Sequence, residues 1–154
     1  MLRRKSSRIR SVTPGVRKMI DDMFATMDQH RAVGVAANQV GRPWRLVVVG
    51  VDDDRLALVN PEIVCSSGSE VADEGCLSRP NWFGPVKRAH EITVRALDAT
   101  GKQILRDAMG LLARVIQHEI DHLDGVIFTD RLTDRDALRF VDPTSDEAQH
   151  LHAS

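Results

Sequence analysis

A short segment, QHEIDH at residues 117–122, constrains the fold of this chain more than any other part of the sequence. On a helix, His118 and His122 lie one turn apart on the same face, close enough for both imidazoles to bind one metal ion. Glu119 follows the first histidine, where the H-E-x-x-H pattern places a carboxylate that can take a proton from water. The alternative is a buried helix whose histidines hydrogen-bond to carbonyl groups. The segment favours a metal site on a buried helix.

The predicted helix covers residues 108–124, with Asp107 as a candidate N-cap and Gly125 just past its end. Its apolar residues occupy more than one face, which is typical of a helix that is mostly buried. We therefore expect the two histidines to point into the protein, towards a sheet or a cleft.

The other periodic segments predict an α+β fold. Apolar residues at helical spacing predict a helix over residues 14–30. Runs rich in β-branched residues predict strands over residues 44–51 and 55–64, the second broken at Asn60-Pro61. Residues 92–107 alternate, turn and alternate again, which predicts a hairpin. An early helix, several strands and one late helix give the order of an α+β protein.

Length and charge limit the function classes. A chain of 154 residues with 42% hydrophobic residues suits one domain. Its 21 basic and 22 acidic residues nearly cancel, which argues against a general nucleic-acid or membrane-surface binder. The longest apolar run, residues 46–49, is far shorter than the ~20 residues of a spanning helix. We expect an intracellular protein, and the Arg- and Ser-rich opening makes a mitochondrial transit peptide the weaker alternative.

Two histidines are one ligand short of a typical catalytic metal site. Asp130 is a weak candidate, whereas Cys76, in a short segment between predicted strands, could supply a thiolate suited to iron, zinc, cobalt or nickel. Cys65 lies outside every motif and is expected to be a structural thiol. His150 and His152, in the polar tail, are expected to be disordered rather than ligands.

Three motifs in order, VGVAANQ at residues 33–39, EGCLS at residues 74–78 and QHEIDH, resemble the peptide deformylase family. The resemblance runs from Leu2 to Leu132 and implies a catalytic domain over residues 1–132, with residues 133–154 a polar tail, helical in part or disordered. It implies antiparallel or mixed sheets around a central metal-binding helix. Members remove the formyl group from the N-terminal formyl-methionine of newly synthesised polypeptides and release formate.

By resemblance, Cys76, His118 and His122 hold one divalent ion, Fe²⁺ in the cell, with Zn²⁺, Ni²⁺ or Co²⁺ able to replace it. Water activated at the metal attacks the formyl carbon, and Glu119 carries its proton to the departing amine. The side-chain amide of Gln39 and the backbone N–H of Leu77 stabilise the developing negative charge.

The resemblance also implies how the substrate binds. An extended N-formylmethionyl peptide lies along the segments containing Gly34 and Gly75, and glycine lets another backbone come close. The methionine side chain enters a pocket lined by Val33, Arg114 and Val115, together with His118, and Arg114 contributes its aliphatic stem. The implied partner is the nascent chain near the ribosomal exit tunnel, and the implied form is a cytoplasmic bacterial monomer, ahead of a mitochondrial or plastid one, with no membrane or specific nucleic-acid partner.

The chain departs from the family pattern in places. Ala32 stands where members usually have glycine, a mild change unless φ is positive there. Trp82 and Phe83 follow EGCLS and are expected to form either an exposed apolar rim or part of the core. Members commonly carry a further strand ahead of residues 2–9, and if that strand covers a sheet edge, we expect its absence to affect stability before chemistry.

Two other functions fit parts of the pattern. A metalloprotease or other amidase would need a third His or Glu ligand downstream, which is not evident, and a structural metal site would need four protein ligands.

Overall fold

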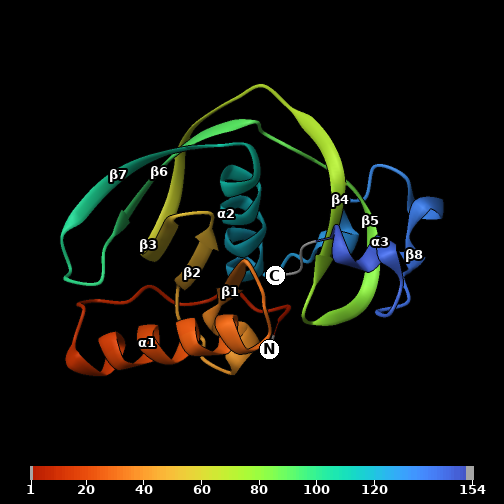
Figure 1. Ribbon diagram of the computed structural model, residues 1–154. Coiled ribbons are helices and arrows are strands. Elements are labelled where there is room, and N and C mark those ends of the chain that lie inside the picture. Colours follow the sequence, from red (N-terminus) through yellow and green to blue (C-terminus); the bar gives the residue numbers. More distant parts are fainter. Residues whose placement is uncertain (1, 152–154) are drawn as a thin grey trace.

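The computed structural model describes residues 2–151 and has the α+β architecture expected from the sequence (Figure 1). A five-stranded sheet has the order β1-β2-β3-β6-β7, and a three-stranded sheet has the order β4-β5-β8. Every pairing between these strands is antiparallel. The helices are α1 (Pro14–Gln29), α2 (Gly110–Leu123) and α3 (Asp146–Gln149), with short 3-10 helices η1 (Ala37–Val40), η2 (Phe128–Arg131) and η3 (Arg135–Ala137). The strands are β1 (Gly34–Ala36), β2 (Leu46–Val51), β3 (Asp54–Ser67), β4 (Glu70–Cys76), β5 (Arg79–Arg88), β6 (Glu91–Leu97), β7 (Gln103–Met109) and β8 (Arg139–Phe140).

Helix α2 lies at the centre, under the curved strands β3, β6 and β7, with β4 and β5 to one side (Figure 1). Eleven of its fourteen residues are buried, as its apolar residues on several faces predicted. Its apolar side chains share one core with residues of β2, β3 and β6. Helix α1 covers a second core through Ile20, Met23 and Met27. The late helix is therefore held on several sides, which makes it a rigid support for functional groups.

The helix over residues 14–30 is confirmed within one residue. Thr13 is the N-cap, and its hydroxyl oxygen accepts a hydrogen bond from the Val16 N–H at 3.2 Å. The expected break at Asn60-Pro61 is a local register shift, and β3 continues beyond it. Asn60 has φ of 53°, and its side chain bonds to both the N–H and the carbonyl of Ile9 at 2.8 Å. The irregular residue thus fastens the N-terminal segment to the sheet.

The prediction of Asp107 as N-cap of the late helix is wrong. Asp107 stays in β7, pairs with Thr93 and accepts a hydrogen bond from the Thr93 hydroxyl at 2.6 Å. The ladder to β6 extends to Met109, which becomes the N-cap, and Gly110 makes the turn into the helix with φ of 59°. Strand pairing outweighs a side-chain cap here because it satisfies several backbone groups at once. Gly125 follows the helix with φ of 79°, as expected.

Other expectations are resolved by burial and backbone angles. Ala32 is not among the non-glycine residues with positive φ, so its backbone accepts alanine. Phe83 is buried and Trp82 is half-buried, so the pair belongs mainly to the interior. Cys65 is exposed, so its expected role as a structural thiol is wrong. Cys76 is the last residue of β4 rather than part of a loop between strands.

The described part of the tail contains η3, β8 and α3, so it is partly helical. Strand β8 pairs with β5 through Trp82 and Phe83. His150 is the C-cap of α3, so the expectation that it is disordered is wrong, and the expectation for His152 lies outside the described residues. Within residues 2–151, no helix is long and apolar enough to cross a membrane.

Candidate metal centre

The two histidines of α2 face each other inside the protein. His118 Nε2 and His122 Nε2 are 3.2 Å apart, and both side chains are buried. Glu119, between them in sequence, is 0% exposed. Their helical spacing therefore produces the paired imidazoles that the sequence predicted.

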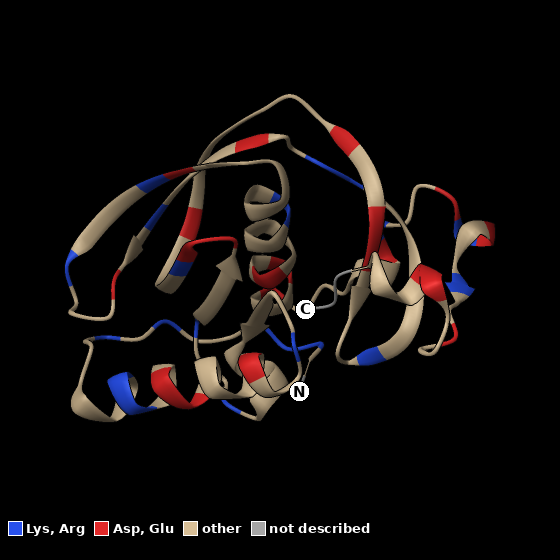
Figure 2. Cartoon of the chain, in the orientation of Figure 1, with Lys and Arg blue, Asp and Glu red and all other residues tan. Residues whose placement is uncertain are grey.

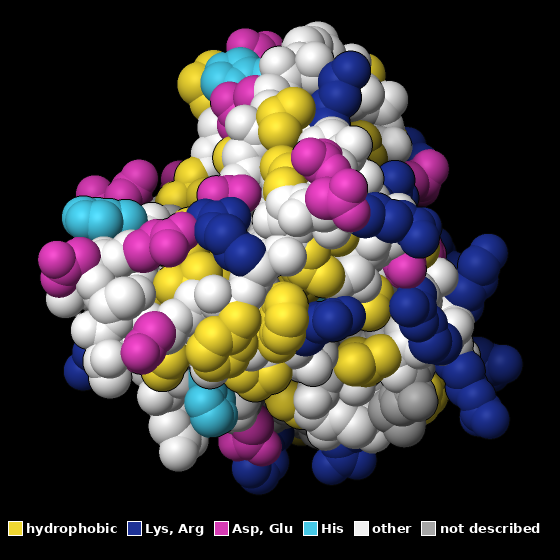
Figure 3. All heavy atoms as spheres, turned by 90° about the vertical axis from the view of Figure 1, so that its right-hand side faces the viewer, with side chains coloured by type: hydrophobic (Ala, Val, Ile, Leu, Met, Phe, Trp, Pro, Cys, Tyr) yellow, Lys and Arg dark blue, Asp and Glu magenta, His cyan; other side chains and the backbone are white. Residues whose placement is uncertain are grey.

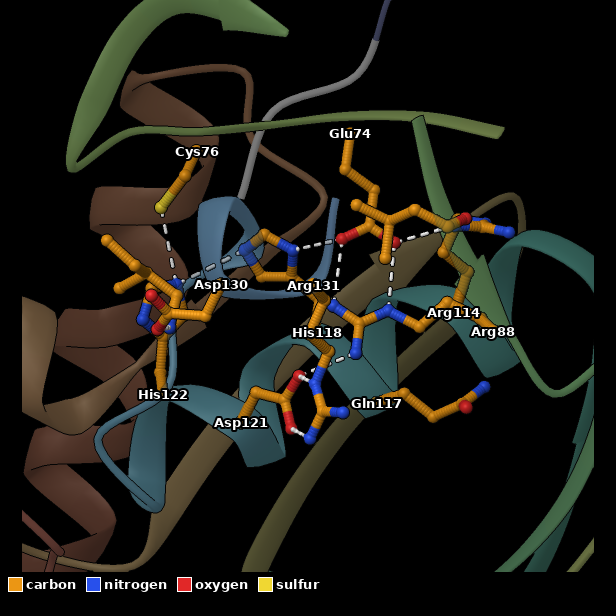
Figure 4. Close-up of polar contacts among 12 residues, drawn as sticks. Glu74, Cys76, Arg88, Arg114, Gln117, His118, Asp121, His122, Asp130 and Arg131 are labelled. Carbon is orange, nitrogen blue, oxygen red and sulfur yellow. Dashed lines mark hydrogen bonds and ion pairs between the residues drawn. The ribbon is translucent and has the colours of Figure 1, made fainter. Parts of the chain in front are cut away.

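Cys76 reaches the same point from the end of β4 (Figure 4). Its Sγ lies 3.2 Å from His122 Nε2, and the three potential ligand atoms lie within 4.8 Å of one another. A tetrahedral ion with one sulfur and two nitrogen ligands would hold them roughly 3.3–3.8 Å apart. The residues therefore fit one divalent ion, and three protein ligands are the number found in catalytic sites that keep one position open.

Glu74 orients one of the imidazoles from behind. Its carboxylate accepts a hydrogen bond from His118 Nδ1 at 2.8 Å, which directs Nε2 of that ring towards Cys76. Carboxylate partners of this kind fix the tautomer of a ligating histidine and raise its basicity. Burial alone would raise the pKa of Glu74, but hydrogen bonds from Arg88 and His118 outweigh it and hold the pKa well below its usual range.

A buried ion-pair network joins the two sides of the site. Figure 2 shows acidic residues on β4 and in the second half of α2. Arg88 bonds to both Glu74 oxygens at 2.9 Å and to Asp121 at 2.5 Å, while Arg131 also binds Asp121. Because β4, β5, α2 and η2 each contribute a charge, the network fixes Cys76 relative to the helix. Sequence analysis missed Arg88, Asp121 and Arg131, and the only signal was Asp121 inside QHEIDH.

Arg114 contributes more than its aliphatic stem. Its guanidinium bonds to Glu74 at 2.6 Å and to the carbonyls of Val86 and Glu70 at 2.9 Å. These contacts hold the charged end in place while the side chain also lines the neighbouring pocket. The residue thus connects the buried network with the expected methionine pocket.

Gln39 is oriented by a backbone donor. Its Oε1 accepts a hydrogen bond from the Ala36 N–H at 2.8 Å, so its Nε2 must point the other way. That nitrogen lies 3.5 Å from Cys76 Sγ and 3.3 Å from the hydroxyl of Ser78. A neutral amide donor therefore faces the Cys76 sulfur. Leu77 is half-buried and follows Cys76 in the turn to β5.

Two glycines are required by neighbouring side chains. A Cβ on Gly34 would lie 2.8 Å from Glu119 Oε1 and 2.8 Å from Val115 Cγ1. A Cβ on Gly75 would lie 2.3 Å from the ring of Phe83. Glycine at these two positions is therefore needed for the packing of Glu119, Val115 and Phe83, whether or not a peptide also binds there.

Ionisation differs between the two imidazoles. Burial lowers the pKa of each, but hydrogen bonds with Cys76 and Glu74 raise the pKa of His118 to about 10. In His122, burial and the neighbouring His118 lower the pKa to about 3. A metal ion needs both Nε2 atoms without protons, so metal binding competes with protonation of His118.

A pocket of about 390 Å³ lies beside the ligands. Val33, Arg114, Val115 and His118, the residues that the resemblance assigned to the methionine pocket, line it together with Gly75. A larger hollow of about 630 Å³, between β3, β7 and the start of α2, contains none of the three ligands. The four residues predicted for the methionine side chain therefore lie at one pocket, and His118 belongs both to this pocket and to the candidate metal centre.

Comparison with known proteins decides the family. The family described as polypeptide deformylase matches residues 1–137. The chain belongs to this family. The peptide deformylase of Thermomicrobium roseum is 44% identical over 95% of this chain and 88% of its own length. Membership confirms the predicted fold class and the prediction of a hydrolase that removes formyl groups from nascent peptides.

Solved deformylases have the same fold. The enzyme from Ehrlichia chaffeensis has a TM-score of 0.84 and 36% identity, covering 88% of this chain and 85% of its own. The enzyme from Synechococcus elongatus, solved in complex with actinonin, has a TM-score of 0.85 and 38% identity, covering 88% and 75%. Together with the three convergent ligands, this deformylase fold supports a divalent metal.

Proposed function

We propose that Cys76, His118 and His122 hold one divalent ion at which this deformylase cleaves N-terminal formyl-methionine. The observation that carries the proposal is the convergence of three buried ligand atoms, two from α2 and one from β4. When bound, the metal polarises the formyl carbonyl and makes water a better nucleophile at neutral pH.

Glu119 moves the proton in this proposal. Its carboxylate is buried beside the ligating histidines, where it can accept a proton from the attacking water. It then gives that proton to the nitrogen of the departing amine, because a free amine is a poor leaving group without one.

Gln39 and Leu77 stabilise the formyl oxygen as it becomes negatively charged. The Gln39 amide already points its Nε2 at the site, and a donor held in place costs no reorganisation during the reaction. The backbone N–H of Leu77 is the second donor, next to Cys76 in the turn after β4.

The peptide binds as an added strand. In the described sheet, β1 is an edge strand that pairs only with β2, so its other edge can bond to an extended peptide. Gly34 and Gly75 belong to the two strands nearest this path. The methionine side chain fills the pocket lined by Val33, Arg114 and Val115, which has room for it.

We further propose Fe²⁺ as the ion in the cell, with Zn²⁺, Ni²⁺ or Co²⁺ as substitutes, since a thiolate and two imidazoles suit all four. Curated relatives come from bacteria such as Bacillus subtilis, which supports a cytoplasmic enzyme. We also propose that it is a monomer and acts on N-formylmethionyl chains near the ribosomal exit tunnel. Metal analysis of the purified protein tests the identity of the ion. The sedimentation coefficient tests whether the protein is a monomer.

The substrate is tested with matched formyl-Met and acetyl-Met peptides. A formyl carbon carries only hydrogen, so a site closed tightly around it has no room for an extra methyl. We expect formyl-Met peptides to be cleaved more than ~10²-fold faster, which corresponds to a misfit of about 3 kcal/mol in the transition state. Comparable release of formate and acetate, or cleavage of an internal peptide bond, would contradict the proposed substrate.

A further inference from the structure

We propose that His150 and Leu151 form the outer wall of the methionine pocket and so help to set side-chain selectivity. The inference rests on the proposed function, because it assigns a substrate side chain to this pocket. Both residues belong to the tail, far in sequence from the motifs that build the rest of the site.

The tail is attached to the domain by several contacts. Strand β8 pairs with β5, and Val141 is buried, with its N–H bonded to the Asn81 carbonyl at 2.7 Å. Arg139 bonds to Asp73 of β4 at 3.0 Å and also to Glu147 of α3. One guanidinium therefore joins the tail helix to the strand that ends at Cys76.

Local hydrogen bonds then set the direction of the last described residues. Ser145 is the N-cap of α3, and its hydroxyl oxygen accepts a bond from the Ala148 N–H at 3.3 Å. The N–H groups of His150 and Leu151 bond to the carbonyls of Glu147 and Ala148. The chain thus leaves α3 along a defined path, and His150 and Leu151 lie at the pocket.

The pocket remains open with the tail in place. It keeps about 390 Å³, so Leu151 lines the space rather than filling it. Val33, Leu111 and Val115 line the same pocket, and Leu151 adds a further apolar surface to them. Figure 3 shows the face of the molecule that carries α3 and β8, with hydrophobic side chains gathered at its centre and charged ones around them.

The acidic residues at the pocket have partners of their own. Glu70 bonds to His90 at 3.1 Å, Asp73 to Arg139, and Glu74 to Arg88. Selection by the pocket therefore rests on apolar contact with a long side chain rather than on attraction of a positive charge.

The experiment compares the metal-loaded wild type with Leu151→Ala and with a chain ending at Gln149. Each is assayed on matched formyl-Met and formyl-Ala peptides, because an alanine side chain is too short to touch the outer wall. We expect the preference for methionine to fall by about fivefold in Leu151→Ala, mainly through a higher KM for formyl-Met, with kcat little changed. The shortened chain should lose at least as much preference.

Gln149→Ala is the matched control, since Gln149 is exposed, adjacent and not part of the pocket, and it should behave as wild type. Arg139→Ala should resemble the shortened chain, because it breaks the link between α3 and β4. Binding of the unformylated methionyl peptide, measured by calorimetry, should weaken by about fivefold in Leu151→Ala and tests the wall without turnover.

Unchanged preference and unchanged peptide binding in Leu151→Ala and the shortened chain would overturn the inference. A lower KM for formyl-Met in the shortened chain would also overturn it, because the tail would then compete with the substrate. If the wild type releases no formate from either peptide, the proposed function fails, while the binding measurement still decides the role of the wall.

Discussion

The two halves of the metal centre are built by different physics. On α2, His118 and His122 converge because a helix repeats every 3.6 residues, so one short segment contains both ligands and Glu119. On β4, Cys76 is 46 positions from His122, and it reaches the helix only because two sheets and the core bring it there. The α2 half is local geometry held by packing, whereas the β4 half depends on the buried charges of Glu74, Arg88 and Asp121.

The two halves should therefore respond differently to substitutions. Losing a ligand should abolish metal binding from either half. Losing a residue of the buried network should shift Cys76 relative to α2 and weaken the site without removing a ligand.

The largest expected effect is on the β4 ligand. Cys76→Ala should lower metal content to background and abolish turnover, because two histidines alone hold an ion weakly. Metal analysis after dialysis measures this directly. Cys65→Ala is the control, since Cys65 is exposed and outside the site, and its metal content should equal that of wild type. Equal metal content in Cys76→Ala and wild type would remove β4 from the metal site.

The second-largest effect is expected at Glu119, where a substitution should lower turnover without changing metal binding. Glu119→Gln should keep its metal and lose at least ~10²-fold in kcat, because the amide cannot accept the proton. Metal content and formate release, measured on the same sample, check both parts. A variant with near-normal turnover would show that another group carries the proton.

The third effect tests the network that joins the halves. Glu74→Gln should destabilise the protein by about 3 kcal/mol, because it leaves Arg88 and Arg114 without their buried carboxylate. Metal affinity should fall roughly 10- to 100-fold, since His118 loses the partner that orients it. Urea unfolding and metal competition titrations measure the two quantities.

The stability of the wild type and that of Glu74→Gln should depend differently on pH. The folded-state pKa of Glu74 lies below the ordinary value of 4.5, so its contribution to stability is complete above about pH 4.5. Below that pH the unfolded chain takes up a proton that the folded chain does not, so the stability gap between wild type and Glu74→Gln should narrow. A gap that stays constant from pH 7 to pH 3 would contradict the lowered pKa.

The smallest effect is expected at an exposed ion pair of similar length. Arg95 and Glu62 are 2.9 Å apart, like Arg88 and Glu74, but their side chains are 45% and 58% exposed. Arg95→Ala should therefore change the free energy of unfolding by no more than about 0.5 kcal/mol. A loss as large as that of Glu74→Gln would mean that distance, rather than burial, sets the strength of these pairs.

The sequence alone was enough to predict the helices and strands whose apolar residues recur at regular spacing. The N-terminal helix, the hairpin of β6 and β7, and the buried helix with its two histidines follow from local patterns that the structure repeats. The sequence offered Cys76 as a candidate third ligand, and the resemblance of three ordered motifs singled it out. It also misjudged the start of α2, because a local cap at Asp107 competes with a strand pairing that only the folded sheet provides.

The tertiary structure decided what depends on distant partners. In the sequence, Arg88 and Asp121 have no feature that distinguishes them from ordinary surface charges. In the folded protein, they are buried together with Glu74. The need for glycine at position 75 is visible only with the Phe83 ring beside it. The tail is held beside the pocket by β8, Val141 and Arg139, which contact β5, Asn81 and β4. Local periodicity depends on residues that are close in sequence. The desolvation and pairing of a charge depend on residues that come close only when the chain folds.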